Sequence, residues 1–300
     1  MCGIVGLFLK DPKLEPKLGD LLSDMLVTMS DRGPDSAGIA IYGKSTQGYM
    51  KITVQSPDPE IDLRVLANDL AVAGMKSSVE LKDTHAVIES TSDPAAVRAF
   101  LVSHHPQVRV MSTGESIEIY KEVGLPKDVV NRFDIRKMAG THGIGHTRMA
   151  TESAVTTLGA HPFSTGPDQC LVHNGSLSNH NTLRRELVRE SIVFETENDT
   201  EVAAAYLTAE MAKGKNLREA LTGALDDLDG FYTFVVGTKS GFGVLRDPIA
   251  CKPAIMAETN GYVAFGSEYR ALAGLPDIER ARVWEPEPAT VYFWEHAAAA

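Results

Sequence analysis

Cys2 directly follows Met1, and this position gives its thiol a chemical option that Cys170 and Cys251 lack. If Met1 is removed, Cys2 carries the α-amine of the chain, whose unperturbed pKa is about 7.7–8.0. A thiolate is a strong nucleophile and an amine that titrates near neutral pH is a suitable base, so one residue then supplies both. The alternative is a cysteine that merely follows Met1. If Met1 is retained, a peptide bond occupies the amine and the base does not exist.

A series of short motifs follows Cys2 in order along the chain. They are residues 2–6 (CGIVG), 32–38 (RGPDSAG), 145–151 (GHTRMAT), 160–163 (AHPF), 173–175 (HNG), 198–201 (NDTE), 228–231 (LDGF), 246–248 (RDP) and 265–268 (FGSE). Each motif is weak evidence alone, but the whole set in this order is specific. The chain therefore resembles the class II glutamine amidotransferases, which are N-terminal-nucleophile hydrolases, over about residues 1–50 and 140–275.

The resemblance implies which residues are catalytic. Cys2 would attack the side-chain amide of glutamine, while the Asn174 amide and the Gly175 N–H would form the oxyanion hole. Preorganised donors of this kind stabilise the charge that develops when a thioester forms and breaks. Without the resemblance, an Asn-Gly pair after a strand predicted over 170–173 would more often be a plain turn.

The resemblance also implies a site for the amino-acid head group of glutamine. Arg148 would hold the α-carboxylate, which its guanidinium can bind through two parallel hydrogen bonds, and Thr151 would add a hydroxyl or backbone donor. Asp199 would meet the α-ammonium group. Each residue has a simpler reading, because Arg148 could make an ordinary ion pair and Asp199 is also favourable at a helix N-terminus.

The scaffold that must position these residues is predicted from apolar patterning. The continuous apolar run at 3–9 predicts a buried strand, and leucines and methionines three or four residues apart predict an amphipathic helix over 17–29. Later strands and blocks of helices, at about 178–190, 199–213 and 217–228, favour an α+β protein. The resemblance implies the four-layer αββα sandwich of the N-terminal-nucleophile hydrolases.

The sequence departs from the family pattern in three places. Met149 and Asn198 stand where the family often has Trp and Ser, and the stretch between Asp35 and Gly145 is unusually long. Long insertions are often functional, so residues 51–135 are predicted to form a small α+β subdomain that docks a partner. The alternative is surface elaboration. The amidotransferase domain is then expected at 1–50 plus 136–296, with 297–300 as a tail.

Composition excludes several classes of protein. The chain has 300 residues and a formal net charge of −11, which argues against binding to a phosphate backbone. No apolar run of membrane-spanning length and no signal peptide is recognised, and three scattered cysteines indicate a reducing, cytoplasmic setting. No His or Cys spacing typical of a metal site is present. We expect His146 and His161 to be structural, hydrogen-bonded histidines.

The sequence lacks a phosphate loop, a nucleotide fingerprint and a cysteine cluster for iron–sulfur ligation. A site that consumes ammonia is therefore expected on another polypeptide, and the chain looks most like the stand-alone amidotransferase subunit of glutamate-synthase-like or N-methylglutamate synthase complexes. No cofactor is expected in this chain, whereas FMN and iron–sulfur clusters are expected in partner subunits.

Two other functions stay open from sequence alone. The amidotransferase site could be unused or structural within an N-methylglutamate synthase complex, which Met1 and the insertion would favour. The chain could also hydrolyse a different amide, although Arg148 together with Asp199 favours a free amino acid.

Overall fold

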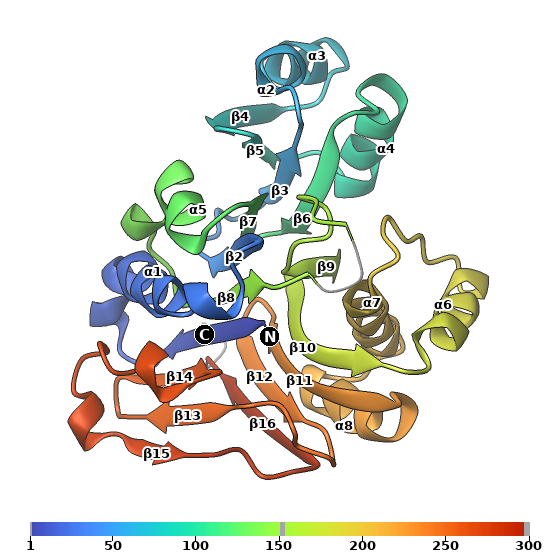
Figure 1. Ribbon diagram of the computed structural model, residues 1–300. Coiled ribbons are helices and arrows are strands. Elements are labelled where there is room, and N and C mark those ends of the chain that lie inside the picture. Colours follow the sequence, from blue (N-terminus) through green and yellow to red (C-terminus); the bar gives the residue numbers. More distant parts are fainter. Residues whose placement is uncertain (1, 151–153, 297–300) are drawn as a thin grey trace.

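The computed structural model describes residues 2–150 and 154–296, and Figure 1 shows their arrangement. The larger of two stacked sheets has seven antiparallel strands in the order β15-β13-β14-β1-β8-β2-β7. These strands are β15 (Arg282–Trp284), β13 (Ile255–Glu258), β14 (Tyr262–Gly266), β1 (Gly3–Leu9), β8 (His142–Arg148), β2 (Ser36–Tyr42) and β7 (Ile117–Val123).

The second sheet has five strands in the order β16-β12-β11-β10-β9. They are β16 (Thr290–Glu295), β12 (Gly241–Arg246), β11 (Gly230–Gly237), β10 (Gln169–Leu177) and β9 (Phe163–Gly166). Side chains of Ile4, Phe8, Val172 and Phe242 belong to the apolar cluster that joins the two sheets. Gly6 lies in this layer because a Cβ there would meet the Phe242 ring at 2.7 Å.

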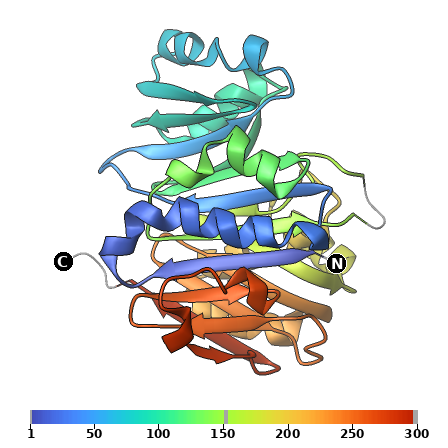
Figure 2. The ribbon, with the colours of Figure 1, turned by 60° about the vertical axis from the view of Figure 1, so that its left-hand side comes forward.

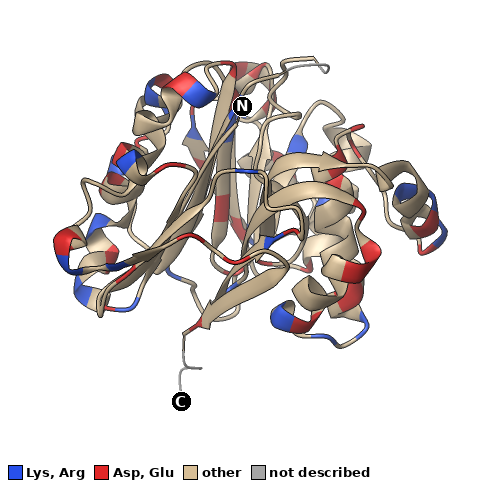
Figure 3. Cartoon of the chain, turned by 60° about the horizontal axis from the view of Figure 1, so that its bottom comes forward, with Lys and Arg blue, Asp and Glu red and all other residues tan. Residues whose placement is uncertain are grey.

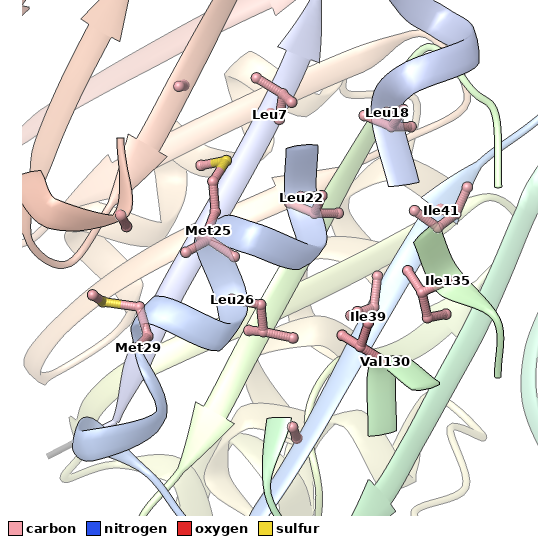
Figure 4. Close-up of a cluster of buried hydrophobic side chains, with 14 of the residues drawn as sticks. Leu7, Leu18, Leu22, Met25, Leu26, Met29, Ile39, Ile41, Val130 and Ile135 are labelled. Carbon is pink, nitrogen blue, oxygen red and sulfur yellow. The ribbon is translucent and has the colours of Figure 1, made fainter. Parts of the chain in front are cut away.

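Helices cover the outer faces of both sheets (Figure 2). On the larger sheet, α1 (Leu18–Thr28) packs Leu22 and Leu26 against Leu7, as Figure 4 shows, and α5 (Pro126–Arg132) lies beside it. On the other sheet lie α6 (His180–Arg189), α7 (Asp199–Ala212) and α8 (Leu217–Asp227). The expected α+β, four-layer αββα architecture is therefore confirmed. It also explains why β1 is apolar at nearly every position, since both faces of the strand are buried.

A third sheet of four strands lies at one end of the molecule (Figure 1). Its order is β4 (Ser77–Lys82), β5 (His85–Ser90), β3 (Met50–Gln55) and β6 (Arg109–Gly114), and its helices are α2 (Pro59–Asp62), α3 (Leu66–Val72) and α4 (Pro94–His104). The segment expected over 51–135 is longer than this unit. Strand β7 pairs with β2, and α5 packs on the larger sheet, so both belong structurally to the sandwich.

Short 3-10 turns complete the chain. They are η1 (Pro12–Lys17), η2 (Ser30–Arg32), η3 (Ile135–Lys137), η4 (Tyr269–Ala271) and η5 (Ile278–Arg280). Residues 267–274 form no longer helix than the turn η4, because Glu268 provides no capping bond at its start and Gly274 follows closely.

Charged residues of both signs are interspersed over the outer helices (Figure 3). None of the helices in the described residues is long and apolar enough to cross a membrane.

Candidate active site

Cys2 lies at the start of the central strand β1 and is partly exposed. The residues after it are anchored, because Gly3 N donates to Thr147 Oγ1 at 3.2 Å and Ile4 N donates to Ser267 Oγ at 2.9 Å. The carbonyl of Cys2 accepts hydrogen bonds from Arg32 Nε at 3.0 Å and from Asn174 Nδ2 at 3.3 Å. Contacts from several distant segments therefore fix the backbone of this residue.

The segment over residues 32–35 helps to hold Cys2 in place. Arg32 also pairs with Glu268 at 2.6 Å, and Asp35 Oδ2 accepts from Ala150 N at 2.8 Å. Gly33 is needed here, since a Cβ would lie 2.5 Å from the backbone of Thr147. Sequence reasoning missed the role of Glu268, although this residue belongs to one of the family motifs.

Asn174 and Gly175 were expected to follow a strand, but they lie within β10. The pairing of β10 with β11 continues beyond them to Leu177. Gly175 has φ +150°, and a Cβ there would meet the Phe231 carbonyl oxygen at 1.9 Å. Only glycine fits this position without backbone movement. The pleat places the buried Asn174 amide beside the carbonyl of Cys2.

A cavity of about 610 Å³ brings the predicted residues together. Its lining includes Cys2, Asn174 and Gly175 as well as both predicted head-group residues, Arg148 and Asp199. Thr151, the remaining predicted substrate contact, lies outside the described residues.

Arg148 is the last residue of β8 and is only 5% exposed. Its Nη1 donates to the Ala154 carbonyl at 3.2 Å, which directs the guanidinium along the segment that follows β8. A buried guanidinium in a cavity is well suited to bind a carboxylate.

Asp199 occupies the first turn of α7, and Asn198 caps this helix by accepting from Thr200 N at 2.9 Å. Asp199 Oδ2 accepts from Leu177 N at 3.0 Å, and Oδ1 lies 3.6 Å from His173 Nδ1. Burial raises the pKa of Asp199, but its interactions with His173 and the Leu177 N–H outweigh burial and lower the pKa to about 2. The carboxylate is thus ionised at neutral pH and can receive an ammonium group.

Three buried histidines lie at the cavity, and two of them, His161 and His173, line it. His161 Nε2 and His173 Nδ1 lie 2.7 and 3.1 Å from Thr200 Oγ1, and His146 stacks on His161 with ring centroids 4.0 Å apart. Burial lowers the pKa of His146 to about 3 and also lowers the pKa of His161 well below its usual value. Both are neutral, hydrogen-bonded histidines at pH 7, in line with the structural role expected from the sequence. The contact between His173 and Asp199 was missed, because no local pattern joins a strand residue to a distant helix start.

Comparison with known proteins gives the same assignment. A domain family described as "Glutamine amidotransferase domain" matches residues 146–274. The glutamine amidotransferase-like protein GlxB of Rhizobium meliloti (strain 1021) is 75% identical over 301 residues, and the match covers 100% of both chains.

The chain belongs to the class II glutamine amidotransferase family. A putative glutamine amidotransferase of Methanothermobacter thermautotrophicus is 33% identical and aligns over 97% of this chain and 99% of its own length. As a member of this family, the chain is an enzyme of the glutamine amidotransfer type.

Solved structures show the same fold in this family. Glutamine phosphoribosylpyrophosphate amidotransferase from B. subtilis superimposes with a TM-score of 0.62 at 19% identity. The match covers 98% of this amidotransferase chain but only 47% of the B. subtilis protein. Among the described residues, no group of three or more His, Cys, Asp or Glu side chains could hold a metal ion.

Proposed function

We propose that this amidotransferase hydrolyses the side-chain amide of glutamine through a thioester at Cys2. The observation that carries the proposal is the convergence of Cys2, Asn174, Gly175, Arg148 and Asp199 on one cavity, from β1, β8, β10 and the start of α7. These elements are far apart in sequence, and the cavity combines a nucleophile with oxyanion donors and an amino-acid head-group site.

The chemistry follows from these groups once Met1 is removed. The α-amine of Cys2 takes the thiol proton, and the sulfur attacks the amide carbon of glutamine. Asn174 Nδ2 and Gly175 N–H stabilise the oxyanion that forms. The amine returns the proton to the leaving nitrogen, so ammonia departs and a γ-glutamyl thioester remains. Water then attacks the thioester through a second oxyanion, which releases glutamate and restores the thiol.

Selectivity for glutamine follows from charge. Arg148 and the ionised Asp199 offer opposite charges to the carboxylate and ammonium groups of a free amino acid. An amide inside a peptide lacks the free carboxylate and ammonium groups, so it could make neither of these two charged contacts.

We further propose that a synthase on another polypeptide receives the ammonia, in a glutamate-synthase-like or N-methylglutamate synthase complex. The support is that the described residues form the amidotransferase sandwich and one small four-stranded sheet, and that the sequence carries no phosphate loop or nucleotide fingerprint. FMN and iron–sulfur clusters are proposed for partner subunits, and no cofactor is proposed for this chain. The four-stranded sheet at one end of the molecule offers a surface for docking.

The test is glutamate release from glutamine by the wild-type protein and by Cys2→Ala, together with the intact mass of both. We expect loss of Met1, release by the wild type and none by Cys2→Ala. Equal rates would contradict the mechanism. Complete retention of Met1 with an inactive wild type would favour the second function, in which the complex does not use this site.

A further inference from the structure

One wall of the cavity has no regular secondary structure. Residues 154–162 precede β9 as turns and irregular segments, and Ala154, Thr156, Gly159 and His161 line the cavity. A wall without helix or strand hydrogen bonds must be held by other contacts.

Lys121 of β7 supplies the first of these contacts. Its side chain is buried, and Nζ donates to the carbonyl oxygens of Leu158 at 3.1 Å, Ala160 at 2.8 Å and Pro162 at 3.2 Å. An ammonium group has three protons, so this arrangement satisfies all of them. The Lys121 side chain therefore ties the second half of the wall to the larger sheet.

Glu122, the next residue of β7, supplies the second contact. Its Oε1 accepts a hydrogen bond from the hydroxyl of Thr157, in the middle of the wall. Its Oε2 accepts from Thr84 Oγ1 at 3.1 Å and lies 3.6 Å from Arg132 Nη1. Glu122 is only 8% exposed, so water competes weakly for these bonds.

The two threonine partners of Glu122 lie in different parts of the molecule. Thr84 belongs to the turn between β4 and β5 of the four-stranded sheet, whereas Thr157 belongs to the cavity wall. One carboxylate thus joins the inserted sheet to the active site. The wall in turn reaches the head-group site, since the Ala154 carbonyl accepts from Arg148 Nη1 at 3.2 Å.

We propose that Glu122, assisted by Lys121, is a positioning residue that sets the affinity of the cavity for glutamine by fixing the wall against Arg148. The inference rests on the proposed function, because it takes the cavity to be the glutamine site. It adds a physical connection, through Glu122, by which a change in the conformation of the four-stranded sheet could alter the affinity for glutamine.

The sharpest probe is Thr157, which contacts Glu122 but does not line the cavity. Thr157→Val keeps the shape and removes the hydroxyl, whereas Thr157→Ser keeps the hydroxyl. Thr84→Val removes the hydrogen bond from the side of the four-stranded sheet. Thr222→Val, at an exposed threonine of α8, is the matched control for the same substitution.

We expect Thr157→Val to raise the KM for glutamine roughly fivefold to tenfold, as loss of a hydrogen bond to a charged group would. We expect kcat to stay within twofold of the wild type. Thr84→Val should raise KM about twofold to threefold, while Thr157→Ser and Thr222→Val should match the wild type. Hydrogen exchange of residues 154–162 should be faster in Thr157→Val and unchanged in Thr157→Ser.

An unchanged KM in folded Thr157→Val would overturn the proposal, even if exchange of the wall became faster, because the contact would then be structural only. A fall in kcat with constant KM would also overturn it. Failure of the proposed function is a separate result, seen when the wild type releases no glutamate. In that case, calorimetric binding of glutamine to Cys2→Ala with and without Thr157→Val decides, and equal affinities or no binding would overturn the proposal.

Discussion

The two sides of the cavity are built in different ways. On one side, Arg148 and Asn174 lie on strands whose backbone ladders fix them opposite Ser36 and Thr233. On the other side, the wall over 154–162 is held by side chains of β7. The strand side carries the oxyanion donor Asn174 and the guanidinium of Arg148, whereas the wall contacts that guanidinium through the Ala154 carbonyl.

This difference predicts how amino-acid substitutions on each side of the cavity affect activity. Residues fixed by a ladder keep their geometry when a neighbouring side chain is changed, so substitutions of the functional groups themselves should mainly alter the chemistry. A wall held by a few polar contacts should instead alter binding when one contact is lost. The substitutions below test this division, from the largest expected effect to the smallest.

Asn174→Ala should lower kcat about a hundredfold to a thousandfold with little change in KM, because an oxyanion donor acts mainly in the transition state. Steady-state glutamate release measures both constants. A change in kcat of less than threefold would remove Asn174 from the oxyanion hole and weaken the account of the strand side.

Asp199→Asn should raise the KM for glutamine roughly thirtyfold, because the substrate ammonium would lose its ionised partner in a partly buried site. The kcat should change less than KM. Asn keeps an oxygen that can accept from Leu177 N, so thermal unfolding checks that the local fold is retained. A larger effect on kcat than on KM would show that Asp199 takes part in the chemistry.

The stacked pair His146 and His161 lies where the two sides meet, and it makes the protein sensitive to acid. The native pKa of His146 is about 3, well below the value of about 6.5 in an unfolded chain. The unfolded state therefore binds more protons between these two pH values, so stability falls as the pH is lowered from about 6.5 towards 3.

Each such histidine contributes up to about 1.4 kcal/mol of lost stability per pH unit in this window. Urea midpoints at pH 7.5, 6.0 and 5.0 measure the effect. We expect a constant midpoint above pH 7 and a falling one below pH 6. A midpoint that stays constant down to pH 5 would mean that these imidazoles are not buried in the neutral form.

Removal of the Thr157 hydroxyl is expected to have a smaller effect than Asn174→Ala or Asp199→Asn, and only on KM. If Thr157→Val lowered kcat as strongly as Asn174→Ala does, the division between the two sides of the cavity would be wrong. Equal effects of Thr157→Val and Thr157→Ser would show that side-chain volume, and not the hydrogen bond to Glu122, controls the wall.

The strand side was largely predictable from sequence, and the wall was not. Continuous apolar runs marked β1, and ordered motifs marked Arg148, Asn174 and Asp199. The extent of β10 was missed because Asn-Gly is typical of turns, whereas pairing with β11 keeps both residues extended.

No pattern in the local sequence predicts the contacts of Lys121 and Glu122. Both residues look like ordinary exposed charges of a strand, and their partners in the wall lie 35 to 41 residues further along the chain. Only the fold shows that they are buried. For the same reason, the boundary expected at residue 135 included β7 and α5, whose pairing and packing with the sandwich are tertiary features.

The central claim is that Cys2 forms a thioester with the side-chain carbonyl carbon of glutamine as ammonia leaves. It is tested most directly by mixing the matured protein with glutamine, quenching in acid and measuring the mass of the N-terminal peptide. We predict a peptide that begins at Cys2 and carries one glutamyl group, and we predict no such adduct in Cys2→Ala. Release of glutamate by a protein whose N-terminal peptide retains Met1 and never carries a glutamyl group would contradict the account.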